Sequence, residues 1–292
     1  MQIYFQNDKI EFESVSIALG NFDGVHIGHM KILENARKAA AYTGVLLFDS
    51  HTREDKVITP FDEKLRILAG LGVDFVYVVS FDEKFRSMTL KEFVRFLKQI
   101  GVKYISVGYD YRCAKNASSD AYDLKKEALE QGIETVISPT VFSNGKAVKS
   151  SDIRSLISCG KIKEANLLMF SPFTISGIVV SGYQNGRKMG FPTANIEPVK
   201  EALLPCDGVY LGKAVIDSKS YKAVINVGKN PTLDAKSRTV EGHIIGLNED
   251  LYGERISFIF YDRIRGEMKF SSLDELKEQI EKDKMYALSV DI

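Results

Sequence analysis

The spacing of apolar residues changes near the middle of this chain of 292 residues, and that change restricts the possible fold more than any other feature. Before about residue 168, short apolar runs alternate with stretches of helical periodicity. From Phe173 onwards, short β-rich runs are separated by turns. The first pattern predicts a parallel sheet with helices on both faces, and the second predicts an antiparallel barrel or sandwich. We therefore expect two domains, over 1–169 and 170–292, divided where Ser171 and Pro172 break a helix.

The expected elements follow from the period of the apolar residues. In the first half we expect strands over 15–19, 44–48, 75–79, 104–107 and 135–137, and helices over 29–42, 62–71, 90–100, 121–131, 150–160 and 162–169. In the second half we expect strands over 175–180, 209–216, 221–227, 240–245 and 256–260, followed by a helix over 273–287.

Composition excludes several classes of protein. Lys plus Arg and Asp plus Glu both number 39, so the chain lacks the basic excess of a general nucleic-acid binder. Its three cysteines are widely spaced and form no Cys-x-x-Cys pair, which favours reduced structural thiols over zinc or a disulfide framework. Residues 1–10 lack the apolar core of a signal peptide, and no apolar run approaches the roughly 20 residues of a membrane span. We expect a cytoplasmic protein and leave its oligomeric state open.

The first candidate site is a glycine-rich turn between an expected strand and an expected helix. Backbone N–H groups and the positive end of a helix dipole meet phosphate in this geometry. His26 and His29 are three apart, so they can face one side of the helix entrance. Nucleotidyl transfer needs such groups to position phosphates and stabilise charge on their oxygens. The alternative is a helix start with two surface histidines. The predicted site comprises Gly20, Asn21, Phe22, Asp23, Gly24, His26, Gly28 and His29.

A weaker signal lies at Ser150-Ser151-Asp152-Ile153-Arg154. A serine here can simply cap the following helix. We also expect Ser151 and Arg154 to face the triphosphate, with Arg154 supplying a charge-assisted contact for catalysis.

The second candidate site lies in the β-rich half. Thr193 and Asn195 are two apart, so on an extended segment their side chains point the same way. A hydroxyl and an amide oxygen on one face can hold Mg²⁺ together with nucleotide phosphates. Glu241, in an expected strand, is a candidate general base for a primary alcohol. Each of these residues alone could be an ordinary solvated loop or strand residue.

Together these segments resemble the bacterial bifunctional riboflavin kinase/FAD synthetase family over about residues 14–285. The resemblance in the first half rests on 20–29 and 150–154. In the second half it rests on Gly190-Phe-Pro-Thr-Ala-Asn-Ile196 and on 226–232, 240–243, 250–253 and 264–270.

The resemblance implies more than the periodicity does. The first half would be a Rossmann-like nucleotidyltransferase that converts FMN and ATP to FAD and pyrophosphate. The second would be a six-stranded antiparallel barrel with a terminal helix that phosphorylates riboflavin to FMN. Mg²⁺ would arrive with ATP, and no tightly bound organic cofactor would be required. Gly190, Thr193 and Asn195 would contact the nucleotide and Glu241 would take the proton from the ribityl hydroxyl. Asp110, Arg112 and Arg265 would contact the flavin.

Some positions depart from the family pattern. The usual Phe-Asp-Pro-His-Pro is Phe48-Asp-Ser50-His51-Thr52 here. The usual Gly-x-Asp-Phe-Arg-Phe-Gly is Gly108-Tyr-Asp-Tyr-Arg-Cys113-Ala114, and 116–119 replaces an expected Arg and Gly-Asp. These positions belong to the expected flavin pocket and its loop.

Three alternatives therefore stay open at this point. The first is a riboflavin kinase whose first half binds nucleotide or flavin without turnover. The second is a flavin-responsive binding protein with no turnover in either half. The third is a first half that adenylylates or cytidylylates another phosphate ester.

Overall fold

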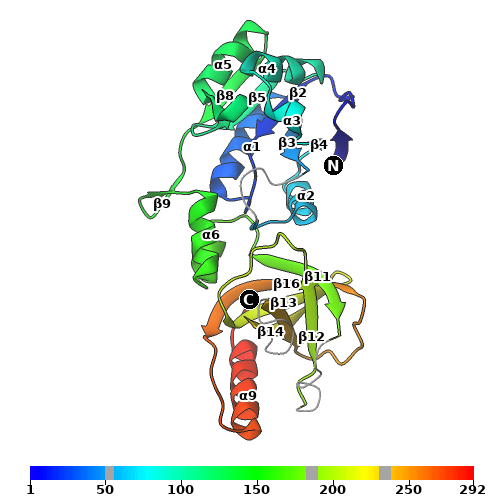
Figure 1. Ribbon diagram of the computed structural model, residues 1–292, viewed down its shortest axis with the longest axis vertical. Helices are drawn as coiled ribbons and strands as arrows, with labels where there is room; N and C mark the ends of the chain where they lie inside the picture. Colours follow the sequence, from blue (N-terminus) through cyan, green and yellow to red (C-terminus); the bar gives the residue numbers. More distant parts are fainter. Residues whose placement is uncertain (50–55, 182–189, 230–237) are drawn as a thin grey trace. The chain divides into compact units, whose positions relative to one another are not determined.

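The computed structural model describes residues 1–49, 56–181, 190–229 and 238–292 (Figure 1). The chain divides into two compact units, Met1–Ser150 and Ser151–Ile292, which we call the first and second units. This division falls at the start of α6 (Ser150–Ser158), upstream of the predicted boundary at 169/170, which stays a prediction.

The first unit is built on a six-stranded parallel sheet. Its strands are β1 (Gln2–Phe5), β2 (Val15–Leu19), β3 (Tyr42–Phe48), β4 (Phe75–Val79), β5 (Tyr104–Gly108) and β8 (Glu134–Ser138). They lie in the order β1-β4-β3-β2-β5-β8, and every neighbouring pair is parallel. All residues of β2 and β4 are buried, which explains why these strands are continuous apolar runs rather than alternating ones.

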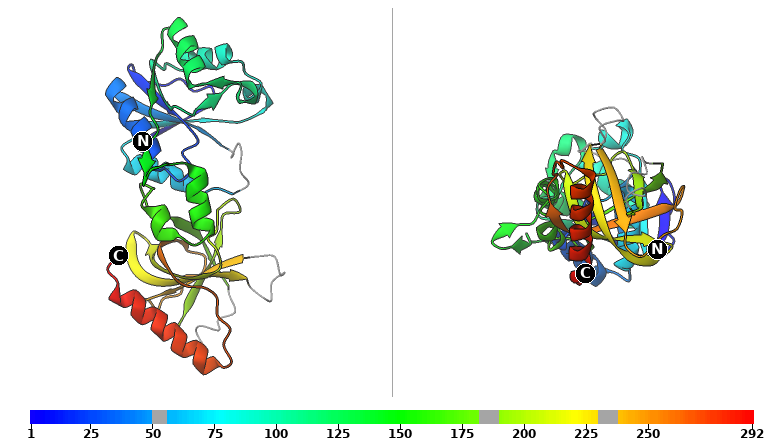
Figure 2. Two further views of the ribbon diagram at one scale, coloured as in Figure 1. Left: turned by 90° about the vertical axis from the view of Figure 1, so that its left-hand side faces the viewer. Right: turned by 90° about the horizontal axis from the view of Figure 1, so that it is seen from below.

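Helices cover both faces of this sheet (Figures 1 and 2). Alternate strand residues point to opposite faces, so Ala18 joins one core whereas Ile17 and Leu19 join the other. The Ala18 core includes residues of α1 (Ile27–Ala39) and α2 (Phe61–Gly70). The opposite core includes residues of α3 (Glu83–Arg86), α4 (Leu90–Gln99) and α5 (Ala121–Glu130). Gly44 permits close packing between strands, because a Cβ there would lie 2.1 Å from the Phe75 ring.

The strand order reverses between β2 and β5. From β2 the chain proceeds through β3 and β4 on one side, and then returns to place β5 and β8 on the other. Loops at the carboxyl ends of β2 and β5 therefore diverge and leave a crevice. In open α/β sheets, ligands bind at such a switch point, so the predicted histidine turn, which follows β2, lies where a ligand is expected.

Short irregular elements follow β5 and β8. After β5 come β6 (Arg112–Cys113), the 3₁₀ turn η1 (Lys115–Ala117) and β7 (Ser119–Asp120), and after β8 comes the hairpin of β9 (Phe142–Ser143) and β10 (Lys146–Ala147). Ala114 has φ 65° and ψ 179°, a region occupied almost only by glycine. The loop that carries the departures from the family pattern is therefore strained at Ala114.

The second unit is a closed antiparallel barrel, preceded by α6 and α7 (Ile162–Asn166). Its strand order is β11-β12-β15-β14-β13-β16, and its interior holds large side chains such as Tyr210, Phe258 and Phe260. The strands are β11 (Thr174–Val180), β12 (Thr193–Pro198), β13 (Gly208–Ile216), β14 (Lys219–Lys229), β15 (Arg238–Ile244) and β16 (Arg255–Arg265).

The terminal helix α9 (Leu273–Ser289) is fastened to the barrel by charged groups. Arg265, at the end of β16, forms a bidentate ion pair with Asp283, with N···O distances of 3.0 and 2.8 Å to Oδ2. Lys222 of β14 donates to the Leu288 and Val290 carbonyls at the C-terminal end of the helix. Cations at this end also interact favourably with the helix dipole.

The predicted fold class is confirmed, namely a Rossmann-like α/β unit followed by a six-stranded barrel and a helix. The sequence analysis did not expect β1 of the parallel sheet, β12 of the barrel, the short helix α3, or the two-residue strands β6, β7, β9 and β10. The second of α6 and α7 is shorter than expected and ends at Asn166. The positions Ser50, His51, Thr52, Arg187, Lys188 and 230–232 lie outside the described residues.

Candidate active sites

The turn between β2 and α1 has an unusual backbone. Phe22, Gly24 and Val25 have φ values of 48°, 79° and 34°, so this turn is left-handed at three positions, two of which are not glycine. Such residues cost free energy and persist only where the surroundings hold them. Phe22 is fully buried and its ring stacks on His29 at a centroid distance of 4.7 Å.

Three side chains from distant segments brace this turn. Thr59 donates its backbone N–H to Asp23 Oδ1 at 3.0 Å, and its hydroxyl accepts from the Gly24 N–H at 3.1 Å. Lys64 Nζ donates to the Asn21 carbonyl at 2.8 Å, and Ser150 Oγ donates to the Asp23 carbonyl at 2.8 Å. The sequence analysis missed Thr59 and Lys64, because single residues in a turn and on a helix carry no motif.

His26 and His29 form a reciprocal cap at the start of α1. His26 Nδ1 accepts from the backbone N–H groups of Gly28 at 3.1 Å and His29 at 3.3 Å, and His29 Nδ1 accepts from the His26 N–H at 3.3 Å. Their rings stack at 3.7 Å. A neutral imidazole whose Nδ1 accepts carries its proton on Nε2. Both rings are therefore arranged as Nε2–H donors. Gly28 makes room for this cap, because a Cβ there would lie 3.0 Å from the His26 ring.

The electrostatics of the site keep both histidines uncharged at neutral pH. Burial lowers the pKa of His26 to about 4, against the opposing influence of Asp110 and Asp23. Burial, followed by the charges of His26 and Lys64, lowers the pKa of His29 well below its usual value. The two rings can thus donate hydrogen bonds to phosphate oxygens without a change of protonation state.

A polar cavity of about 270 Å³ lies beside these histidines. It is lined by Gly20, Asn21, Gly28 and both histidines from the turn, and by Asp110 and Arg112 from the loop after β5, with Lys149 and Ser150 nearby. Most residues predicted for the turn thus meet in one cavity, whereas Phe22, Asp23 and Gly24 are buried and do not line it. Ser151 and Arg154 lie on α6 in the second unit, and their contribution stays a prediction.

A second cavity of about 390 Å³ shares Gly20, Asn21, Tyr111 and Arg112 with the first. Its remaining walls include four aromatic side chains, those of Phe48, Phe81, Phe85 and Phe93. The sequence analysis missed these residues, because phenylalanines in apolar runs are indistinguishable from ordinary core residues. Cys113, Ala114 and Asn116, which depart from the family pattern, also line this cavity. Burial raises the pKa of Cys113 to about 12, so its thiol is protonated.

On the barrel, the predicted residues of the second site lie on the neighbouring strands β12 and β15. Asn195 is paired in register with Glu241. Thr193 Oγ1 donates to Glu241 Oε1, and Asn195 Nδ2 lies 3.4 Å from the same oxygen. A hydroxyl, an amide and a carboxylate therefore converge on one point. On the other side of β15, Asn226 of β14 is also paired with Glu241.

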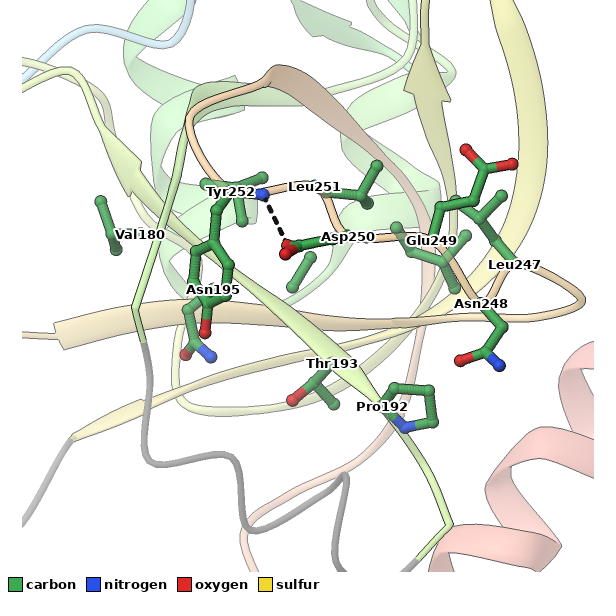
Figure 3. Close-up of a pocket in the computed structure, with 13 residues that line it drawn as sticks. Val180, Pro192, Thr193, Asn195, Leu247, Asn248, Glu249, Asp250, Leu251 and Tyr252 are labelled. Carbon is green, nitrogen blue, oxygen red and sulfur yellow. Dashed lines mark hydrogen bonds between the residues drawn. The ribbon is translucent and has the colours of Figure 1, made fainter.

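Thr193 and Asn195 line a cavity of about 110 Å³ between the start of β12 and the segment after β15 (Figure 3). The opposite wall is 247–252, where the Tyr252 N–H donates to Asp250 Oδ1 at 3.2 Å. Gly190 precedes β12 with φ 86° and is not part of this lining. Arg265 is also absent from it: the structure places this side chain against Asp283, and its predicted contact with flavin stays a prediction.

The two units together define a class. A histidine-capped helix start at the switch point of a parallel sheet suits the binding of a phosphate group, and a carboxylate beside hydroxyl and amide groups suits proton removal from an alcohol. The fold and both candidate sites therefore fit the class of two-unit phosphate-transferring enzymes. Comparison with known proteins refines this class. A riboflavin kinase family model matches residues 169–290 and an FAD synthetase model matches residues 8–152.

The relatives cover nearly the whole chain. The bifunctional riboflavin kinase/FMN adenylyltransferase of Escherichia coli K12 is 36% identical over 94% of this chain and 92% of its own. That of Bacillus subtilis is 34% identical over 93% and 91%. The chain therefore belongs to the bifunctional riboflavin kinase/FMN adenylyltransferase family, as the sequence resemblance indicated.

A solved structure supports the fold. The crystal structure of a protein described as a macrolide-efflux protein from Streptococcus pneumoniae is 31% identical, covers 100% of both chains and has a TM-score of 0.90. In the part of the present chain that is described, no helix has both the length and the apolar character that crossing a membrane requires.

Proposed function

We propose that the second unit transfers the γ-phosphoryl group of ATP to riboflavin, giving FMN, and that the first unit joins FMN to the AMP part of ATP, giving FAD and pyrophosphate. The observation that carries this proposal is the match to a riboflavin kinase model and an FAD synthetase model in one chain, and a chemically different candidate site in each unit supports it. Since ATP is the donor in both steps, we place the protein in the cytoplasm.

In the first unit, an FMN phosphate oxygen attacks the α-phosphorus of ATP and pyrophosphate leaves. The Nε2–H groups of His26 and His29 and the N-terminal end of α1 stabilise the charge that develops on the α-phosphate oxygens. The aromatic cavity suits the flat flavin ring, which packs well against phenylalanines. Arg112 lines both cavities and is suited to a charge-assisted bond with the FMN phosphate, beside Asp110.

In the second unit, Glu241 takes the proton of the terminal ribityl hydroxyl, whose oxygen attacks the γ-phosphorus while ADP leaves. Thr193 and Asn195 orient the carboxylate through their contacts with Oε1. Hydroxyl and amide oxygens are hard donors, so Thr193 and Asn195 also fit Mg²⁺ brought by ATP, which would neutralise phosphate charge.

Incubation with riboflavin, ATP and Mg²⁺, followed by chromatography of the flavins, tests both activities. FMN and FAD together support the proposal. FMN alone would show a first unit without turnover, and no conversion would indicate a binding protein. In Glu241→Gln we expect no FMN from riboflavin but normal FAD from supplied FMN. The matched control is Glu197→Gln, which removes the charge of an exposed carboxylate on the same barrel.

The reciprocal variant is His29→Ala. Loss of one donor to a transition-state oxygen lowers the rate by about 10²–10³-fold, so FAD formation should fall by this factor while FMN formation continues. Near-normal FAD output would remove His29 from the mechanism, and equal loss of both activities in either variant would contradict two separate sites.

A further inference from the structure

A lysine in the wall of the polar cavity has no part in the chemistry described so far. Lys149 lies between β10 and α6 and lines the cavity that His26 and His29 also line. This lysine is exposed, and its ammonium group forms no hydrogen bond or ion pair with any residue that the structure describes. Because a lysine carries its charge on a flexible four-carbon stem, the ammonium group can turn toward a ligand in this cavity.

The backbone on either side of Lys149 is fixed. Val148 donates its N–H to the Val141 carbonyl at 2.9 Å, and Ser150 Oγ donates to the Asp23 carbonyl at 2.8 Å. The second of these bonds joins the segment to the turn between β2 and α1, which leads into the histidine cap. The backbone of Lys149 is thus held at the cavity wall, while its side chain is left to respond to a ligand.

The described lining of this cavity carries one surplus positive charge. Both histidines are neutral at neutral pH, because burial lowers the pKa of each. The charged side chains of the lining are Asp110, Arg112 and Lys149, so the first two cancel and the charge of Lys149 remains. Arg112 also donates its Nε–H to the Ala117 carbonyl at 3.1 Å. Lys149 is therefore the cation that an anionic ligand of this cavity would meet without displacing an existing contact.

The two cavities of the first unit indicate which phosphate group this cation suits. Arg112 lines both of them, so FMN with its ring in the aromatic cavity would bring its phosphate to their boundary. In the proposed reaction the α-phosphate of ATP lies beside the histidines and the start of α1. Lys149 lines the polar cavity and not the aromatic one. The β- and γ-phosphates, which carry most of the charge of ATP, are the anionic groups that remain for this wall.

We propose that Lys149 is a further catalytic residue of the first unit, whose ammonium group binds the β- and γ-phosphates of ATP and stabilises them as they leave as pyrophosphate. This inference rests on the proposed adenylyl transfer. In that step an FMN phosphate oxygen bonds to the α-phosphorus, and the bond from this phosphorus to the α,β-bridging oxygen breaks. The bridging oxygen leaves with the electron pair, and the charge of Lys149 offsets the negative charge that pyrophosphate gains.

The first test is Lys149→Met, which keeps the length of the side chain but removes its charge. We expect kcat/KM for ATP in FAD formation to fall by about tenfold, and the inhibition constant of added pyrophosphate to rise by a similar factor, the low end for hydrogen bonds to charged groups. The KM for FMN and the formation of FMN from riboflavin should not change. The matched control is Lys146→Met, which removes the same charge from an exposed residue of β10 that does not line the cavity.

The second test separates the charge of Lys149 from any support that its side chain gives to the fold. Lys149→Arg keeps a cation and should retain most of the activity with ATP and most of the inhibition by pyrophosphate. Raising KCl from about 0.05 M to about 0.5 M shortens the Debye length about threefold, so an exposed charge acts more weakly. The advantage of the unmodified chain over Lys149→Met should therefore shrink at least about twofold at the higher salt concentration.

Each outcome supports or overturns the proposal. Parallel losses toward ATP and pyrophosphate, which arginine restores and salt diminishes, support it. An unchanged inhibition constant for pyrophosphate in Lys149→Met, an equal rise in the KM for FMN, or a loss that salt does not alter overturns it while leaving the proposed function intact. An equal effect of Lys146→Met also overturns it, because any nearby charge would then suffice. Absence of FAD formation by the unmodified chain overturns the proposed function and this inference together.

Discussion

Replacing Ala114 by glycine tests the strain in the loop after β5. Ala114 has φ 65° and ψ 179°, and the family pattern has glycine at this position. A non-glycine residue in such a region costs about 1–3 kcal/mol. Glycine also lowers the free energy of unfolding by about 0.5–1 kcal/mol, because it gives the unfolded chain more conformational freedom. We therefore expect Ala114→Gly to stabilise the first unit by about 1 kcal/mol, which raises Tm by about 2–4 °C for a unit of this size.

Differential scanning calorimetry of the whole chain measures this shift. Each transition can be assigned to a unit by the activity, FAD or FMN formation, that is lost over the same temperature range. The matched control is Ala40→Gly at an ordinary extended residue with φ −149° and ψ 164°. There no strain is relieved, and we expect a loss of about 0.5–1 kcal/mol. If both substitutions lower Tm alike, the reasoning from strain is wrong.

Three further predictions concern acid stability, the anchoring of α9 and the packing of the sheet. Between about pH 6.5 and 4 the first unit should lose stability on acidification, and His26 should account for about 3 kcal/mol of the loss, because with its pKa of about 4 it stays neutral when folded and takes up a proton when unfolded, while the lowered pKa of His29 adds to the loss. Urea unfolding across this range checks it, and an equally steep loss in His26→Gln would contradict it. Arg265→Met leaves Asp283 buried without its cation and should cost the second unit about 3–5 kcal/mol, much of it recovered in Arg265→Met/Asp283→Leu. Calorimetry of the single and double variants tests this, and no recovery would refute it. Gly44→Ala places a Cβ 2.1 Å from a ring atom of β4 and should cost about 1–3 kcal/mol or more, whereas Gly70→Ala, with nothing within 4 Å, should cost nothing. Equal urea midpoints for these two variants would rule out the packing argument.

Most of the fold could be predicted from the sequence because its signals are local. The period of the apolar residues distinguishes the parallel sheet from the barrel, and α4 and α5 begin where expected, at Leu90 and Ala121. The histidine turn was found for the same reason, since its glycines and histidines lie within ten residues and follow a buried strand.

What the sequence analysis missed depends on contacts between distant residues. β12 contains Ala194 and Asn195, which have weak strand propensity, and it is bounded by Pro192 and Pro198. It forms a strand because β11 and β15 provide a ladder on either side. Lys64 resembles an ordinary solvated helix lysine in sequence, and only the folded chain brings it against Asn21.

The strand that carries Thr193 and Asn195 is also the one that closes the ring, since β12 joins β11 to β15. The barrel cannot be completed before β12 is in place, so we expect folding of the barrel and assembly of the proposed site to occur together. Side-chain replacements on this strand can separate chemistry from folding, as Asn195 can change while the ladder remains. Substitutions that disrupt the backbone of this strand, such as a proline, should abolish both folding and activity.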